Sequence, residues 1–267
     1  MANLFKKVLF FILLPCLFLF GCHPRQEKRS TPPPQEPIEM IKDGAWNTEM
    51  VDISKIHPDK KLVALTFDDS PTDKLDALLE VFISFNKTHH DCPATATLFC
   101  NGRGLNKRFK ESLYTAFTLG MELGNHSFSH HDLTTLSAEQ IQEEIGRVDE
   151  LLQEIDGNPL HLFRAPYGRT DERVLEQVAV PVIDWFADTR DWSDRSADQL
   201  IKRTFEKLED GAIVLLHDGY ESTIAGIERL LPALYEKGYQ AVSVSQMAKA
   251  HGCRLKVGKV YTRARKQ

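Results

Sequence analysis

Five short segments of this chain bring together acids, histidines and one arginine, the residue types that bind metals and transfer protons. Two neighbouring acids, Asp68 and Asp69, stand in the first segment, and the second carries His126 and His130 four residues apart. If the chain turns helically there, both imidazoles project from one face and can bind one ion. The later segments supply Arg164, Asp191 and His217.

The positions of these segments favour a functional interpretation over a structural one. A histidine pair alone is more often a surface or structural feature, and Asp69 before Pro71 could merely cap a helix. Each segment, however, follows an apolar run typical of a strand, so the reactive groups stand at equivalent ends of successive strands. Barrel-type α/β enzymes assemble active sites at such ends. A carboxylate from the first segment would complete a two-histidine, one-carboxylate metal site.

The remaining charged and aromatic residues indicate how such a site would work. Adjacent side chains of a strand point to opposite sides, so one acid could bind the ion while the other acts as general base. Arg164 could hold a carboxylate ionised and Asp191 could favour the imidazolium of His217, although each could equally belong to an ordinary surface ion pair. Apolar surface for a sugar or an acyl methyl, if not for the core, would come from Tyr167, Trp192 and Leu215 or Leu216.

Strand-like and helix-like stretches alternate along the chain about seven times. The apolar stretches do not alternate cleanly with polar residues, as expected for strands of a parallel sheet that is covered on both faces. The clearest amphipathic stretch is 137–155, where Ser137 and Gln140 offer a capping box. The predicted strands are 62–67, 94–99, 121–125, 162–164, 180–185, 212–216 and 240–244, and the other predicted helices are 74–85, 107–119, 170–178, 197–208 and 224–235.

This alternation predicts an α/β fold with a parallel sheet and right-handed crossovers. A glycine-rich phosphate-binding turn is missing after the first strand, where Asp68 and Asp69 stand instead, and this argues against a nucleotide-binding sheet. We therefore expect a (β/α) barrel, distorted or incomplete, with about seven parallel strands.

The first 21 residues have the layout of an export signal. Lys6 and Lys7 precede an apolar run of 13 residues, 8–20, which is shorter than the roughly 18 residues of a membrane-spanning helix. We therefore expect a cleaved signal rather than a permanent membrane span. The last residues of this run and the two that follow, Leu19-Phe20-Gly21-Cys22, resemble the lipobox of bacterial lipoproteins. That resemblance implies lipidation of Cys22 and a protein tethered to a bacterial membrane, facing the periplasm or the cell exterior.

Composition divides the rest of the chain into three parts. Residues 22–45 are rich in proline and polar residues and predict an extended linker, although the last ten could pack on the domain as an arm. Residues 46–250 suffice for one α/β domain. Residues 251–267 form a basic tail, which is either a solvated, frayed terminus or a surface attracted to anionic envelope polymers or lipid headgroups.

Charge and cysteine content narrow the class of protein further. The formal net charge of −5 becomes −7 once the two lysines of the signal are removed, so nothing indicates a nucleic-acid partner. Three cysteines remain in the body, Cys92, Cys100 and Cys253. A Cys92–Cys100 bridge is chemically permitted outside the cytoplasm, but Cys100 ends an apparent strand that would separate the two thiols. We expect buried free thiols.

Taken together and in this order, the five segments resemble the polysaccharide deacetylases of carbohydrate esterase family 4, the NodB-type deacetylases. The resemblance covers about residues 61–247, and its motifs are 66–71, 126–130, 164–167, 188–192 and 215–218. It implies a divalent metal, zinc or else cobalt. The residues that carry over are the metal ligands Asp69, His126 and His130, the general base Asp68, the general acid His217, Arg164 orienting Asp68, and Asp191 tuning His217.

The resemblance also implies a reaction. Water activated by the metal and Asp68 attacks an acetamide carbonyl, the metal and a backbone N–H near Tyr167 stabilise the oxyanion, and His217 protonates the departing amine. Two positions depart from the usual family pattern, because Ser70 stands in place of glycine and His131 in place of proline. His131 comes five residues after His126, on another face of a helical turn, and we exclude it as a ligand.

These observations predict a hydrolase, namely a lipid-anchored, exported deacetylase acting on an N-acetylated envelope glycan such as peptidoglycan or another N-acetylglucosamine polymer. Removal of O-acetyl groups from xylan, or of acyl groups from another sugar, would use the same catalytic residues. A non-catalytic glycan-binding lipoprotein should have lost at least one of them. A metal-scavenging protein built on His126 and His130 would leave Arg164 and Asp191 unexplained.

Overall fold

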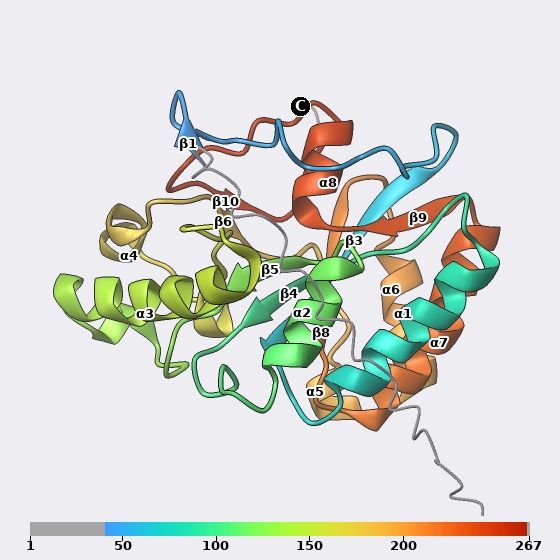
Figure 1. The fold of residues 1–267 in the computed structure, drawn as a ribbon, viewed down its shortest axis with the longest axis horizontal. Coiled ribbons are helices and arrows are strands. Elements are labelled where there is room, and N and C mark those ends of the chain that lie inside the picture. The colour runs from blue at the N-terminus through green and yellow to red at the C-terminus, as the bar shows by residue number, and fades with distance from the viewer. Residues whose placement is uncertain (1–40, 266–267) are drawn as a thin grey trace, which may run out of the picture. The chain divides into compact units, whose positions relative to one another are not determined.

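The computed structural model describes residues 41–265, which fold around a central parallel sheet (Figure 1). The sheet has six strands in the order β5-β4-β3-β8-β7, with β9 also paired to β3. The strands are β3 (Lys61–Ser70), β4 (Thr97–Cys100), β5 (Glu122–Asn125), β7 (Ala187–Asp188), β8 (Ala212–His217) and β9 (Tyr239–Val242).

The longest strand, β3, organises the sheet and sets the register of the reactive residues. It pairs with β8 from Val63↔Ala212 to Asp68↔His217, so the predicted base and the predicted acid lie opposite each other on neighbouring strands. On its other side β3 pairs first with β9 and then with β4. All these pairings are parallel, which brings the carboxyl ends of the strands to one end of the molecule.

The barrel is distorted, as expected. Beyond β5 the curvature continues through two single bridges, Asn125↔Phe163 and Phe163↔Val182, to β6 (Val182–Ile183). The strands predicted at 162–164 and 180–185 are therefore reduced to one bridge and one short strand. Proline explains part of this, because Pro166 follows the first stretch and Pro181, which has no N–H to donate, begins the second.

Helices cover the sheet, and Figure 1 shows α1, α6 and α7 along one flank and α3 along the other. The predicted capping box of α3 is confirmed, since Ser137 and Gln140 bond reciprocally at its start, and the helix ends at Gly157 with φ 81°. The helices are α1 (Leu75–Thr88), α2 (Lys110–Thr118), α3 (Ala138–Asp156), α4 (Glu172–Gln177), α5 (Asp191–Asp194), α6 (Ala197–Glu206), α7 (Glu221–Glu236) and α8 (Val244–Ala250), with 3-10 turns η1 (Leu133–Thr135) and η2 (Pro166–Gly168).

Alternate residues of β3 feed two different hydrophobic clusters. Val63, Leu65 and Phe67 pack with the apolar faces of α1 and α7, whereas Leu62 and Ala64 pack on the inner side of the barrel with residues such as Phe99, Phe163 and Ile213. The same inner face continues with Thr66 and Asp68, both of which are buried. The site is therefore built directly on top of a packed core.

Both ends of the described chain fold onto the domain. Strands β1 (Ile41–Lys42) and β2 (Ala45–Trp46) form a hairpin, and Trp46 is buried, so the end of the expected linker packs as an arm. The expected frayed tail is also ordered through residue 265, because β10 (Val260–Tyr261) pairs with β6 and Leu255 and Ala264 are buried. Apolar residues among the basic ones explain this packing. The predicted signal, Cys22 and linker residues 22–40 lie outside the described residues.

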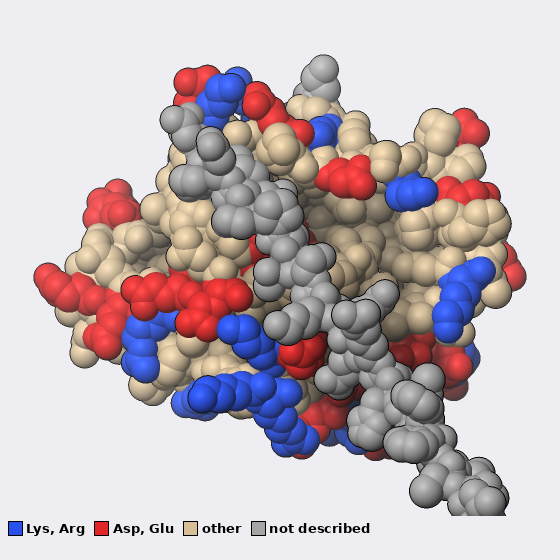
Figure 2. All heavy atoms as spheres, viewed as in Figure 1, with Lys and Arg blue, Asp and Glu red and all other residues tan. Residues whose placement is uncertain are grey.

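The surface and the cysteines complete the description. Within residues 41–265 no helix is long and apolar enough to cross a membrane. Lys and Arg side chains lie interspersed with Asp and Glu on the face shown in Figure 2. Cys92 and Cys100 are buried free thiols, as expected, and Cys253 is a half-buried one. Burial raises the pKa of the Cys100 thiol well above its usual range, which makes it unreactive.

Candidate metal centre and active site

The residues singled out from the sequence meet at the carboxyl ends of the strands. Asp68 and Asp69 lie near the end of β3, His126 directly follows β5, and His217 ends β8. Arg164 follows the bridging residue Phe163, and Asp191 begins α5. Segments that are far apart in sequence thus contribute to one cluster of ionisable groups.

The carboxylate and the two imidazoles predicted to bind a metal are close enough to share one ion. One potential ligand atom each from Asp69, His126 and His130 lies within 4.8 Å of the others. His126 is buried, and its Nδ1 donates to the backbone oxygen of Arg164 at 2.8 Å, which leaves Nε2 free as a ligand. Burial lowers the pKa of His130 and favours the neutral imidazole that binds metals. This donor set fits a zinc-like divalent ion.

The backbone brings these ligands together in a way that the sequence did not indicate. His126 and His130 lie in a loop rather than in the expected helical turn, with φ values of 61° at Ser127 and 56° at His130. Asp69 likewise has a φ of 61°. These left-handed conformations are uncommon for non-glycine residues and redirect the side chains. They allow Asp68 and Asp69, neighbours in the chain, to serve one site.

Asp68 is held as a buried carboxylate by Arg164. The guanidinium donates to Asp68 Oδ1 at 2.6 Å and to Thr66 Oγ1 at 2.8 Å, and it also donates to the backbone oxygens of Ile183 and Asp184. Burial alone would raise the pKa of Asp68, but the charges of Arg164, His126 and His217 and the Arg164 hydrogen bond together outweigh it, and the pKa lies below its usual range. With its Oδ2 3.6 Å from His126 Nε2, Asp68 lies beside the predicted ligand cluster, where the predicted base should be.

His217 has the opposite electrostatic environment. Its Nδ1 lies 2.9 Å from Asp191 Oδ1, and its backbone N–H donates to Asp191 Oδ2 at 2.8 Å. Thr223 Oγ1 donates to the same Oδ2 at 2.7 Å, which fixes the buried carboxylate. Burial would lower the pKa of His217, but the hydrogen bond to Asp191 and the charges of Asp68, Asp191 and Asp69 together raise it above the usual value. His217 is therefore suited to hold a proton and release it.

Replacing Asp191 by asparagine should reveal this tuning. The Asp191→Asn change removes one of the charges that raise the pKa of His217 and weakens its hydrogen bond, so the pH above which kcat/KM declines should fall. The pH profile of kcat/KM measures this directly. Asp188→Asn, at the end of β7 and without a bond to His217, is the control and should leave the profile in place. An unchanged profile in Asp191→Asn would contradict the tuning.

The residues expected to contact substrate divide into two groups. Tyr167 and Trp192 are among the most exposed large apolar side chains of the described residues, at 60% and 50%, and the Tyr167 ring stands edge-on to His130 at 4.7 Å. Leu215 is only 4% exposed and therefore packs beneath the site, offering little surface to a sugar. His131 is exposed and contacts Ser129, outside the ligand cluster, in keeping with its exclusion.

Comparisons with known proteins agree with this geometry. The family model "Polysaccharide deacetylase" matches residues 55–180. The solved structure titled "T48 deacetylase with substrate" superposes with a TM-score of 0.70 at 30% identity, covering 79% of this chain and 99% of that one. The chain belongs to the polysaccharide deacetylase family. Family membership accounts for both the distorted barrel and the order of the five motifs.

Two further relatives show the range of this family. The peptidoglycan-N-acetylmuramic acid deacetylase PdaC of Bacillus subtilis is 30% identical over 210 residues, which cover 78% of this chain and 44% of that protein. This chain thus spans less than half of that relative's length. A family 4 acetyl xylan esterase from Clostridium thermocellum, solved with a cobalt ion, has a TM-score of 0.70 at 26% identity, covering 76% of this chain and 98% of that one.

Several supporting residues of this deacetylase domain escaped the sequence analysis. Asn101 Nδ2 donates to Asp69 Oδ1 at 2.9 Å and orients that ligand. The buried Asp218 accepts from Ser70 Oγ at 2.9 Å and from the Thr72 N–H at 3.1 Å, tying the turn after Asp69 to the residue after His217. Burial raises the pKa of Asp218 to about 6. The sequence did offer one indication of this contact, namely serine in place of the usual glycine at position 70, because the Ser70 hydroxyl donates to Asp218.

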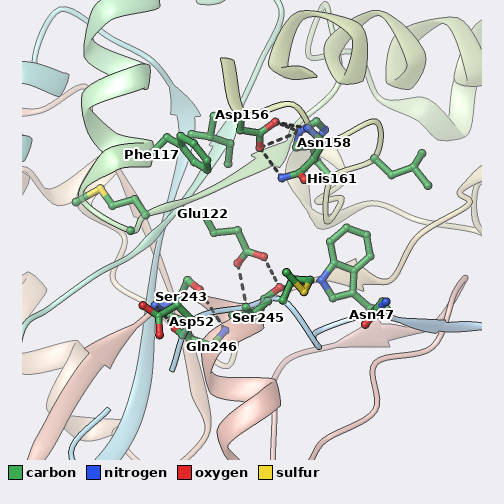
Figure 3. A pocket seen from close by; sticks show the side chains of 17 residues that line it. Asn47, Asp52, Phe117, Glu122, Asp156, Asn158, His161, Ser243, Ser245 and Gln246 are labelled. Carbon is green, nitrogen blue, oxygen red and sulfur yellow. Dashed lines mark hydrogen bonds and ion pairs between the residues drawn. The ribbon is translucent and has the colours of Figure 1, made fainter. Parts of the chain in front are cut away.

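A second buried polar cluster lies around His161, on the wall of a pocket away from the metal centre (Figure 3). His161 lies between Asp149, at 2.9 Å, and Asp156, at 3.3 Å. Asp149 Oδ1 also accepts from Asn125 Nδ2, and Asn125 in turn accepts from the Ser127 N–H in the histidine loop. The cluster therefore supports the loop that carries the histidine ligands.

The His161 cluster should make stability depend on pH in the alkaline range. Burial opposes the charge, but the two aspartates raise the pKa of His161 to about 9. Because the pKa of His161 is higher in the folded than in the unfolded protein, its protonation stabilises the folded state. This contribution is complete below the unfolded-state pKa of 6.5 and is lost as the pH rises through 9. We expect denaturant unfolding to show a loss of up to about 3 kcal/mol between these values. In His161→Gln the free energy of unfolding should change little over the same pH interval. An equal pH dependence in both proteins would show that His161 is not the titrating group.

Proposed function

We propose that this chain is a metal-dependent deacetylase that hydrolyses N-acetyl groups of a cell-envelope glycan and releases acetate. One observation carries the proposal. A two-histidine, one-aspartate cluster is flanked by a carboxylate paired with Arg164 and by an imidazole bonded to Asp191, which helps to raise its pKa. A base, an acid and a metal-binding set at one site are the groups that amide hydrolysis requires.

The described residues divide the work of hydrolysis between the two sides of the site. Asp68 takes the proton of the attacking water, because Arg164 keeps it ionised and its Oδ2 faces the ligand cluster. His217 gives its proton to the departing amine nitrogen, because Asp191 holds the imidazolium. A backbone N–H near Tyr167, in η2, is the expected oxyanion donor. A bound divalent metal would polarise the carbonyl and acidify the water.

Zinc is our proposed ion, with cobalt as the alternative. Two imidazoles and one carboxylate suit zinc, which keeps positions open for water and substrate in such sites. The cobalt ion in the Clostridium thermocellum esterase supports the tolerance of a related site for that metal.

Peptidoglycan or another N-acetylglucosamine polymer is the proposed substrate class, and an exported, lipid-anchored location is proposed with it. The B. subtilis relative carries peptidoglycan in its name, which supports an envelope glycan. The signal-like segment before Gly21-Cys22 supports export and lipidation of Cys22. A tethered enzyme would meet the glycan of its own envelope.

Acetate release tests this proposal. A chain beginning at Ile41 retains both hydrophobic clusters, and a solved relative of similar extent is 99% covered by this one, so it should fold alone. The protein is stripped of metal, resupplied with zinc or cobalt, and given peptidoglycan, chitooligosaccharide or acetylated xylan. Release from the first two only after metal is restored would support the proposal. Release from xylan alone would favour an O-deacetylase, and metal binding without release from any polymer would favour a binding protein.

A further inference from the structure

Arg195 is fixed at the rim of the site in a way that ordinary surface arginines are not. It ends α5 in a left-handed conformation, with φ 54°, and its Nε donates to the backbone oxygen of Trp192 at 3.0 Å. Its guanidinium carbon lies 3.7 Å from the ring centroid of Tyr220. That ring is 6.2 Å from the ring of His217. The cation therefore stands one aromatic ring away from the predicted general acid.

The guanidinium of Arg195 is also uncommitted, whereas other cations of the same end of the molecule are paired. No carboxylate among residues 41–265 lies within ion-pair distance of Arg195. By contrast, Arg169 pairs with Asp132 at 2.7 Å and Arg203 with Asp194 at 2.6 Å. Stacking and one hydrogen bond hold Arg195 in place while leaving its terminal nitrogens free to donate. A guanidinium fixed in this way presents paired N–H donors in a geometry that fits the two oxygens of a ligand carboxylate.

We propose that Arg195 forms a subsite for a carboxylate carried by the glycan next to the acetamide under attack. The proposal rests on the proposed function and names the substrate class, an anionic N-acetylated glycan. N-acetylmuramic acid has this chemistry, because its lactyl group, which ends in a carboxylate, is ether-linked to the carbon next to the one that carries the acetamide. When the amine leaves toward His217, that carboxylate lies on the same sugar, and we place it at the guanidinium of Arg195 beyond Tyr220.

The net charge of the protein favours such a subsite for an anionic ligand. The chain has a formal net charge of −5, so its overall field opposes an anionic polymer. A single unpaired arginine beside the general acid offsets this repulsion locally and favours the strand register that brings an acetamide to the ligand cluster. A neutral chitooligosaccharide gains nothing from it.

The test compares one glycan in two charge states. Glycan strands of peptidoglycan, freed of peptides, are used as such and after amidation of their carboxylates, and kcat/KM for acetate release is measured with metal-loaded protein. We expect Arg195→Met to lower kcat/KM about tenfold on the carboxylated strands and less than twofold on the amidated ones. Arg195→Lys should recover part of the loss, and 1 M salt should erase most of the difference, since the Debye length is then about 3 Å.

Arg229→Met is the control. It removes the same charge from an exposed arginine of α7, on the outer flank of the barrel, where Arg229 pairs with Asp198 at 2.8 Å, and should change neither rate. Equal losses of Arg195→Met on both substrates would show a structural role and overturn the proposal, as would no loss on either. Should the parent protein release no acetate from any polymer, the proposed function fails by itself. Calorimetric titration of the same two strand preparations then decides whether Arg195 binds the carboxylate.

Discussion

Replacing His217 by alanine should lower kcat by 10²–10⁴-fold, the usual contribution of a general acid, while metal content stays at the parental level. The reason is geometric. His217 lies opposite Asp68 on the neighbouring strand and is bonded to Asp191, whereas the groups proposed to bind the metal are Asp69, His126 and His130. Acetate release and elemental analysis of the same preparation measure the two quantities.

Asp69→Ala is the counterpart of that variant. It removes one of three ligand groups, so metal content and activity should fall together, and excess zinc should restore part of both. A loss of metal in His217→Ala equal to that in Asp69→Ala would overturn the division of roles. Retained metal with full activity in His217→Ala would assign the acid to another group.

Arg164→Met should be the most destabilising single change near the site, by about 3–5 kcal/mol. Arg164 is among the largest fully buried side chains of the described residues, and its guanidinium lies 4.1 Å from the Phe99 ring centroid. Without it the buried Asp68 carboxylate and two backbone oxygens lose their donors. Urea unfolding at neutral pH gives the change in the free energy of unfolding.

A double-variant cycle separates charge from packing in this result. Asp68→Asn in the Arg164→Met background removes the uncompensated charge, so the double variant should regain a substantial part of the lost stability. Strict additivity of the two single changes would mean that the pair is not coupled in the folded state. Thr66→Val removes one neutral acceptor of the same guanidinium and should cost far less.

The sequence analysis succeeded where local pattern decides structure. Helix α3 was predicted from its apolar stripe and its Ser137 cap, and the first strand from the apolar run that ends in Asp68 and Asp69. It failed where distant partners decide. The stretch 180–185 was expected to be one strand, but the chain forms β6, leaves it, and forms β7 from Ala187, because each part pairs with a different neighbour. The β1–β2 hairpin likewise depends on contacts with the C-terminal segment.

The candidate site shows the same division. The types and order of the reactive residues placed all of them at one end of the strands, but their supports could not be read from the chain. Thr223 lies 32 residues from Asp191, and Asn101 lies 32 residues from Asp69. The loop between His126 and His130 contains no glycine, so the sequence did not predict its left-handed backbone conformations. These conformations are imposed by packing against distant parts of the chain.

Four non-glycine residues around the ligand cluster, Asp69, Ser127, His130 and Tyr167, share the left-handed backbone region. Each costs about 1–3 kcal/mol relative to an unstrained residue, and the surrounding packing holds them in this conformation. These four positions should therefore not be changed to raise the thermal stability of this protein. Replacing Ser127 or Tyr167 by glycine would relieve backbone strain and should raise the melting temperature. The same change would make the loops around the ligand cluster more flexible, so the turnover number should fall. Gains in durability should be sought in the helices on the outer flanks of the barrel.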